Sequence, residues 1–242
     1  MHIKIYKDHH ALSTAAADEM IALLNDNPEA VICLASGHTP QLTCELFVVN
    51  ALKNKTDLSR FTFIGLDEWV GIPPGNPGTC HYFFEYELFS HLSIPSNNIH
   101  LFDSISNNLQ KECEKMDKVI SSKGGIDLMI VGIGMNGHIG FNEPGVSFDL
   151  YSHVIELDDV TRTVGQKYFS GYTNLHQGIT IGLQHLQEAK RVLLLANGKK
   201  KGSLIHQTVK GEITKTFPAT IIQTHPNGVV MIDEEAAHLL DK

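Results

Sequence analysis

Two groups of residues have side chains that can move protons. Asp67 and Glu68 follow directly on an apolar run, and His138 lies between Asn136 and Glu143 in a Gly-rich stretch. A carboxylate acts as a general base when partial burial raises its pKa toward the working pH. Each residue also has a structural interpretation, an N-cap or ion pair for the acids and a hydrogen-bonded core position for the histidine. The combination favours an acid–base site, because loops at strand ends carry catalytic groups on a rigid scaffold.

A second stretch contains groups that suit an anion: Ser36, Gly37, His38 and Thr39. Thr39 followed by Pro40 predicts a helix that Thr39 caps, and the free N–H groups at such a helix start bind phosphate. The three consecutive lysines Lys199 to Lys201, after another predicted strand, offer a charge-assisted donor for the same anion. The alternatives are an ordinary capped turn for the first stretch and a solvated helix start for the lysines.

These candidate residues lie at the ends of predicted strands. A helix over 11–25 is expected to lead the fold, because its apolar residues recur at helical spacing. Short apolar runs that indicate buried strands occur at 31–35, 61–66, 127–133, 191–196 and 229–232. The sequence therefore predicts one α/β domain over residues 1–242, with a single open, mostly parallel, doubly wound sheet flanked by helices. Ligands bind such Rossmann-like sheets at the carboxyl ends of the strands.

The composition argues against several classes of partner. The chain has 242 residues and a net charge of −8, so no basic field attracts a nucleic acid or an anionic membrane surface. No apolar run approaches the length of a membrane span, and the N-terminus opens no apolar signal region. We therefore expect a cytoplasmic protein whose partner is a small molecule, with any phosphate held by local donors.

The cysteines and histidines do not indicate a disulfide or a metal site. Cys33, Cys44, Cys80 and Cys113 match neither a C-x-x-C pair nor a zinc ribbon in their spacing. The 14 histidines include no H-E-x-x-H motif. We expect four reduced thiols and no metal.

A rival interpretation is a dinucleotide site. Residues 132–137 match the pattern G-x-G-x-x-G, and Glu156 stands close to the position of a ribose-binding acid. That motif requires a long helix to begin within it. Gly140, Pro144 and Gly145 would break such a helix within two turns, so nicotinamide or flavin binding is not expected.

Several motifs resemble those of the glucosamine-6-phosphate deaminase family. The longest runs from Gly132 to Gly145 and reads GIGMNGHIGFNEPG. Further matches are Leu66-Asp67-Glu68-Trp69, Ser36-Gly-His-Thr-Pro40, Thr161-Arg162, Gly198-Lys-Lys-Lys201 and Phe217-Pro-Ala219. Within the family, three segments look more like the galactosamine-6-phosphate branch: Asp67-Glu-Trp69, Pro77-Gly-Thr-Cys80 and Lys123-Gly-Gly-Ile-Asp127.

The resemblance implies an enzyme that converts a hexosamine 6-phosphate to a ketohexose 6-phosphate and ammonia without an organic cofactor. Asp67 would move a proton from C2 to C1 of the open sugar. His138, oriented by Asn136 and Glu143, would open the pyranose ring. The resemblance assigns the 6-phosphate to Ser36, Gly37, His38, Thr39, Arg162 and Lys201.

Two residues depart from the family pattern. Asn136 stands where many members have Asp, and a neutral amide stabilises an imidazolium less than a carboxylate does, so Glu143 must supply the charge. His38 stands where a small residue is common, and a positive φ at this position would be strained in a histidine.

Two other functions fit parts of the pattern. A 6-phosphogluconolactonase-like hydrolase shares the architecture by resemblance but does not require the set Asp67, His138 and Glu143. A non-catalytic sugar-phosphate sensor needs only the phosphate loop, although a fused DNA-binding segment is then expected and none is visible. The sequence leaves open which C4 epimer is used and whether the protein forms a homo-oligomer.

Overall fold

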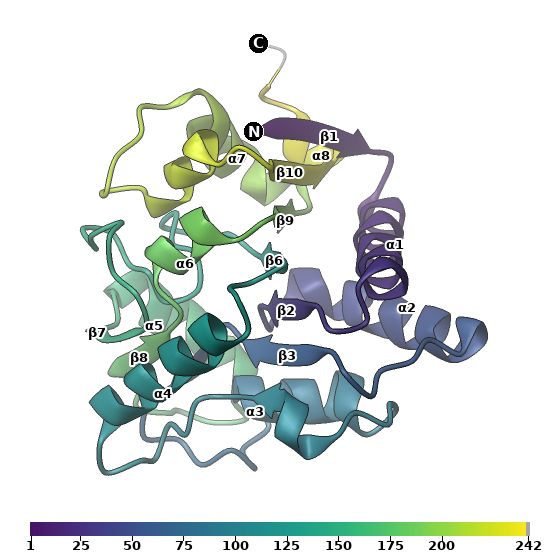
Figure 1. Ribbon diagram of the computed structural model, residues 1–242. Helices are drawn as coiled ribbons and strands as arrows, with labels where there is room; N and C mark the ends of the chain where they lie inside the picture. Colours follow the sequence, from purple (N-terminus) through teal and green to yellow (C-terminus); the bar gives the residue numbers. More distant parts are fainter. Residues whose placement is uncertain (241–242) are drawn as a thin grey trace.

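Seven strands form the central sheet of the computed structural model, which describes residues 1–240 (Figure 1). Across the sheet they are β1 (His2–Tyr6), β10 (Gly228–Asp233), β9 (Val192–Ala196), β6 (Leu128–Val131), β2 (Val31–Leu34), β3 (Thr62–Gly65) and β5 (Ile99–His100). Every neighbouring pair is parallel. The predicted fold class is thus confirmed, while residues 241–242 of the expected domain lie outside the described residues.

The order of the strands creates a crevice near the middle of the sheet. The chain builds from β2 outward to β3 and β5, and from β6 in the other direction to β9 and β10. The segments that leave the carboxyl ends of the neighbouring strands β2 and β6 therefore diverge. Such a switch point is where open α/β sheets bind ligands.

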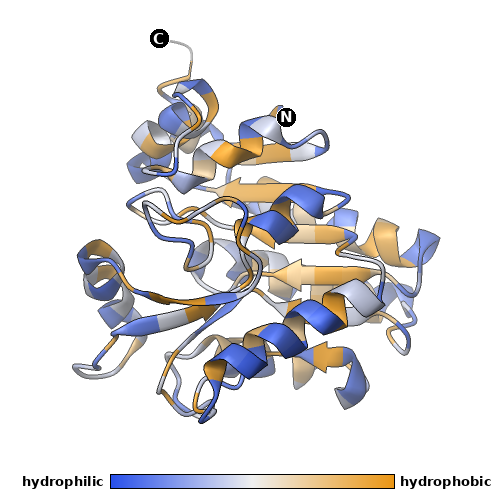
Figure 2. Cartoon of the chain, turned by 60° about the vertical axis from the view of Figure 1, so that its left-hand side comes forward, coloured by the Kyte–Doolittle hydropathy of each residue, from blue (hydrophilic) through white to orange (hydrophobic). Residues whose placement is uncertain are grey.

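Helices cover both faces of this sheet. They are α1 (His9–Asp26), α2 (His38–Asn54), α3 (Cys80–Phe84), α4 (Leu109–Ser122), α5 (Asp159–Gly165), α6 (Leu183–Glu188), α7 (Gly202–Lys210) and α8 (Glu234–Ala237). In Figure 1, α1 and α2 lie to the right of the strands, and α4 and α6 lie to the left. Figure 2 shows the hydrophobic strands between these two layers of amphipathic helices.

Alternate residues of the strands face two separate hydrophobic cores. In β2, Val31 and Cys33 belong to the core under α4, α6 and α7, whereas Ile32 and Leu34 belong to the core under α1 and α2. All four side chains are buried. A strand that is buried on both faces has no polar side to alternate with, which is why its sequence is a continuous apolar run.

The first element differs from the prediction. We expected a helix to lead the fold, but β1 precedes α1 and pairs with β10 at the edge of the sheet. Ile3 and Ile5 of β1 are 39% and 49% exposed, so this strand lacks the buried apolar run on which the prediction relied. The helix predicted at 11–25 is present, and it begins two residues earlier because Asp8 caps it by accepting a hydrogen bond from Ala11 N at 2.8 Å.

A second, smaller sheet was not predicted. It contains β4 (Asp67–Trp69), β8 (Gln177–Thr180) and β7 (His153–Glu156), all antiparallel. β4 begins only one residue after the end of β3, separated from it by Leu66. The chain therefore passes from the central sheet into the small sheet at Asp67, which places this residue at the junction of the two.

The Gly-rich stretch after β6 forms turns, in agreement with the prediction that no long helix begins there. In the described chain the next helix is α5, at Asp159, and Gly137, Gly140 and Gly145 all have positive φ. The structure thus lacks the helix that a dinucleotide motif requires. Within residues 1–240, no helix is both long and apolar enough to cross a membrane.

Candidate active site

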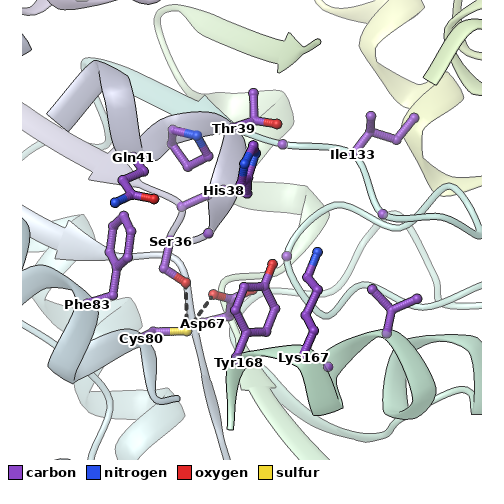
Figure 3. A pocket seen from close by; sticks show the side chains of 18 of the residues that line it. Ser36, His38, Thr39, Gln41, Asp67, Cys80, Phe83, Ile133, Lys167 and Tyr168 are labelled. Carbon is purple, nitrogen blue, oxygen red and sulfur yellow. Dashed lines mark hydrogen bonds between the residues drawn. The ribbon is translucent and has the colours of Figure 1, made fainter. Parts of the chain in front are cut away.

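A pocket of about 970 Å³ lies at the carboxyl edge of the central sheet (Figure 3). Its walls come from the loop after β2 and the start of α2, from β4 and α3, and from the Gly-rich turn after β6. The remaining wall is formed by α5 with the short helix that follows it (Gln166–Tyr168) and by the segment Gly198–Lys201 after β9. Segments that are far apart in the sequence thus meet around one cavity.

The loop after β2 presents the N-terminus of α2 to this pocket. The helix begins at His38, and its N-cap is Gly37, with φ +110°. The prediction that Thr39 caps the helix is therefore wrong. A glycine with positive φ turns the chain two residues earlier, and the Thr39 hydroxyl instead donates to Asn197 Oδ1 at 2.7 Å, which ties α2 to the end of β9.

His38 is accommodated without strain. The positive φ that the loop requires falls on Gly37, and His38 is the first helical residue. Its exposed ring stacks on that of His9, with centroids 6.3 Å apart, while the residue still lines the pocket. The backbone of the loop is therefore shaped by the glycine, and the histidine adds a ring at the rim.

Lys167 and Lys201 are two of the four lysines that line the same pocket as the start of α2, together with Lys199 and Lys200. Lys201 is half-buried and donates to the Ile133 carbonyl at 2.6 Å. Burial, with a smaller contribution from the charge of Lys167, lowers the pKa of Lys201 to about 8. Lys167 follows α5 and lines the same pocket, and Figure 3 shows its side chain pointing into the cavity. An anion placed here would be near two cationic groups and one helix N-terminus.

Arg162 does not join this group. It is not among the residues that line the pocket, and its guanidinium pairs with Asp159 on the same turn of α5. Lys167, five residues further on, occupies the pocket wall instead. Arg162 was assigned to the phosphate by resemblance, and the structure places it outside the cavity.

The two acids after β3 have different surroundings. Glu68 accepts hydrogen bonds from three backbone N–H groups: its own strand neighbour Trp69 at 2.8 Å, Cys80 at 3.0 Å and His81 at 2.8 Å. It therefore anchors the start of α3. Asp67 lines the pocket, and burial followed by the charge of Glu68 raises the pKa of Asp67 to about 7. Of the pair, Asp67 is the carboxylate that is available as a base.

His138 is held by contacts on both sides of its ring. Its Nδ1 lies 3.3 Å from Glu143 Oε2 and 3.0 Å from Thr161 Oγ1. The ring also lies so close to Gly134 that a Cβ at this glycine would be 2.2 Å from His138 Nε2. The imidazole is thus fixed in the pocket wall, with its Nδ1 side turned to Glu143 and Thr161.

Asn136 supports His138 indirectly. Its Nδ2 donates to Glu143 Oε2 at 2.8 Å, and its Oδ1 accepts from the backbone N–H of His138 at 3.3 Å. Burial alone would raise the pKa of Glu143, but His138, Thr161 and Asn136 together lower it. Glu143 is therefore an anion in contact with the imidazole, while Asn136 holds this carboxylate and the turn.

The structure brings together most of the predicted site residues. Asp67, His138, Lys201 and the stretch 36–39 line the pocket, and Asn136 and Glu143 lie behind His138. Sequence reasoning missed Lys167 and did not assign roles to Thr161 or Cys80, although both belong to motifs noted above. Lys167 follows a short helix without an apolar stripe, so only its position in space reveals it. Among residues 1–240, no group of three or more His, Cys, Asp or Glu side chains could hold a metal ion.

Comparisons with known proteins found a family model and several relatives that match this chain over most of its length. Residues 7–231 match the family described as glucosamine-6-phosphate isomerases/6-phosphogluconolactonase. The chain is 36% identical to a glucosamine-6-phosphate deaminase of Thermoanaerobacter pseudethanolicus over 99% of its length and 95% of the relative's. It is 37% identical to a glucosamine-6-phosphate deaminase of Shouchella clausii, over 98% of this chain and 95% of the relative.

Solved structures show the same fold. A monomeric glucosamine-6-phosphate deaminase superposes with a TM-score of 0.95 at 31% sequence identity, covering 99% of this chain and 100% of the other. A 6-phosphogluconolactonase from Trypanosoma brucei has a TM-score of 0.78 at 18% identity, over 99% of this chain and 98% of the other. At that identity the likeness concerns the fold alone.

Proposed function

The chain belongs to the family of glucosamine-6-phosphate isomerases and 6-phosphogluconolactonases, and we propose that it converts glucosamine 6-phosphate to fructose 6-phosphate and ammonia. One observation carries the proposal: a single pocket combines a carboxylate whose pKa is raised to about 7, an imidazole paired with a carboxylate, and a cationic helix start. The deaminases described above, which match nearly the whole chain, support it.

The phosphate group is assigned to the start of α2. Backbone N–H groups after Gly37 and the positive end of the helix dipole favour an anion, and Lys167 and Lys201 add charge. This binding is remote from the bonds that change, so its role is to position C1 and C2 of the sugar.

The acid–base steps are assigned to the opposite part of the pocket. His138, with Glu143 stabilising its charged form, moves the proton that opens the pyranose ring. Asp67 then takes the proton from C2 and delivers it to C1, which gives a ketose imine. Water adds to C2 of the imine, a proton passes from that water to the nitrogen, and the C–N bond breaks to release ammonia and leave a ketone at C2. A pKa near 7 suits Asp67 to both halves of this transfer.

A galactosamine 6-phosphate substrate is a second candidate. The motif residues that suggested this branch, Trp69 and Cys80, both line the pocket. The relatives described above, however, are glucosamine-6-phosphate deaminases and give that branch no support. The two substrates differ only at C4, so the side chains around that carbon decide between them.

The deciding assay measures ammonia and ketose phosphate released from glucosamine 6-phosphate and from galactosamine 6-phosphate. The expected result is turnover of glucosamine 6-phosphate with the higher kcat/KM, and its loss in Asp67→Asn. A higher kcat/KM with galactosamine 6-phosphate would replace the first candidate by the second. Hydrolysis of 6-phosphogluconolactone without ammonia release would favour the lactonase alternative, and binding without turnover would favour a sensor.

Arg162 in α5 and Lys167 after it provide a test of the phosphate assignment, because one lies outside the pocket and the other lines it. Lys167→Ala should raise KM about tenfold or more, because it removes a charge that faces the pocket. Arg162→Ala should change KM less than threefold, because its guanidinium pairs with Asp159 outside the cavity. A larger effect for Arg162→Ala would restore the assignment made by resemblance.

A further inference from the structure

Cys80 lies in the pocket between the loop after β2 and Asp67. Its Sγ accepts a hydrogen bond from Ser36 Oγ at 3.0 Å and lies 3.5 Å from Asp67 Oδ1, to which it donates (Figure 3). The residue is the first of α3, and its backbone N–H is held by Glu68 at 3.0 Å. The thiol is thus placed by two independent anchors, one at its backbone and one at its sulfur.

The thiol carries its proton at neutral pH. Burial, followed by the charges of Glu68 and Asp67, raises the pKa of Cys80 well above its usual range. Because Ser36 donates its own hydroxyl proton to the sulfur, the S–H proton of Cys80 is free to point toward Asp67. The direction of both hydrogen bonds therefore runs from Ser36 through Cys80 to the carboxylate.

The other titratable groups that act on Asp67 are acids. They are Glu68 on the same strand, Cys33 of β2 and Tyr168 after α5, and each can only repel the ionised carboxylate or remain neutral. Among residues 1–240, the S–H group of Cys80 is the one side-chain donor within hydrogen-bond distance of Asp67. The ionised carboxylate thus depends on this thiol for a direct partner within the protein.

We propose that Cys80 is a positioning residue for the reaction, whose S–H group holds the Asp67 carboxylate in place and favours its ionised, basic form. Through Ser36 the same thiol connects the base to the loop assigned to the phosphate. The inference rests on the proposed function for the role of Asp67 as base, whereas the hydrogen bond itself does not depend on any substrate.

The first test reads the hydrogen bond without substrate. The carboxyl group of Asp67 is titrated by carbon-13 NMR in aspartate-labelled protein, with Asp67→Asn used to assign its signal. Cys80→Ala should raise the pKa of Asp67 by about half a pH unit or more, since the ionised form loses its donor. Cys80→Ser retains a donor and should leave the pKa at or below that of the wild type. An unchanged titration in Cys80→Ala would overturn the proposal.

A matched control separates this effect from the loss of a buried thiol in general. Cys113→Ala removes a fully buried thiol on α4, away from the pocket, and should leave the titration of Asp67 unchanged. A shift as large as that of Cys80→Ala would mean that the packing of the protein, rather than the S–H group, sets the pKa.

A second measurement needs no Cys80 variant to be active. The S–H stretching band of Cys80, assigned by its absence in Cys80→Ser, should lie at lower frequency than those of the other thiols and move upward in Asp67→Asn. An S–H band at the same frequency in the wild type and in Asp67→Asn would show that the thiol does not donate to Asp67.

Activity then tests the catalytic part of the inference. The acidic limb of kcat/KM should move with the NMR titration in Cys80→Ala and return in Cys80→Ser. If the NMR titration moves and the limb does not, the hydrogen bond stands, and the assignment of Asp67 as the base fails together with the catalytic role of Cys80.

Discussion

Asp67 and Lys201 both line the pocket, and the pKa of the acid is raised while the pKa of the lysine is lowered. Burial raises the pKa of Asp67 to about 7 and lowers that of Lys201 to about 8, because a low-dielectric wall disfavours the charged form of either group. The proposed reaction needs both groups charged. The free enzyme is therefore fully competent only in the narrow range between the two values.

This predicts a narrow bell for kcat/KM against pH, with a rising limb near the Asp67 pKa of about 7 and a falling limb near the Lys201 pKa of about 8. Bound phosphate stabilises the charged lysine, so the falling limb should move to higher pH in kcat. Lys201→Arg stays charged and should lose the falling limb of kcat/KM. A falling limb that persists unchanged in this variant would show that another group titrates there.

The contacts of His138 predict unequal effects for its two supporting residues. Glu143→Gln should lower kcat by about a hundredfold or more, because it removes the anion 3.3 Å from the imidazole. Asn136→Ala keeps that charge, so it should cost about tenfold or less. Steady-state kcat of the two variants at several pH values checks this. A greater loss in Asn136→Ala would mean that the turn, and not the charge, limits the reaction.

At the scale of elements, the pocket depends on how α2 and α5 begin and end. The N-terminus of α2 lies at the pocket, and its N-cap Gly37 adopts a positive φ at this turn. α5 contributes Thr161 to His138, and the residues after it contribute Lys167 and Tyr168. One short segment thus reaches both the proposed ring-opening group and the proposed phosphate site.

Gly37→Ala tests the shape of the loop before α2. The residue has φ +110°, and an added Cβ would lie 3.2 Å from the Tyr168 hydroxyl. We expect a loss of about 1–3 kcal/mol in the free energy of unfolding and a clear rise in KM. Gly75→Ala is the control, because no atom lies within 4 Å of its added Cβ. Equal behaviour of the two variants in denaturant titration and kinetics would contradict the role given to Gly37.

At the scale of the whole molecule, the proposed active site costs stability. A group whose pKa is raised on folding is ionised more readily in the unfolded chain. Between the usual pKa of an aspartate, about 4, and the native value of about 7, rising pH therefore favours unfolding. Asp67 opposes folding in this range, and the two cores on either side of the sheet supply the compensating stability.

Asp67→Asn should accordingly be more stable than the wild type near neutral pH, by on the order of 4 kcal/mol. The gain should be absent below about pH 4, grow as the pH rises, and level off above about pH 7. Urea unfolding of both proteins at a series of pH values measures it. A gain that does not depend on pH would contradict the raised pKa of Asp67.

The sequence by itself determined five of the seven strands of the central sheet, all except the edge strands β1 and β5, and the main candidates of the site. Strands such as β2 are short runs of consecutive apolar residues, and this signal is local. The glycines around His138 and the position of Asp67 directly after a strand can also be recognised from neighbouring residues in the sequence. For strands β3 and β6, which lie on either side of β2, parallel topology then places the carboxyl ends at one edge, where these residues meet.

Only the tertiary structure decided which of several similar residues face the pocket. Glu68 could not be told from Asp67 until three N–H groups, two of them from α3, were found on its carboxylate. Lys167 lies on the pocket wall, whereas Arg162, five residues before it, pairs with Asp159 outside the cavity. The two contacts of Glu68 with α3 join residues 12 and 13 positions apart, so no local pattern in the sequence records them.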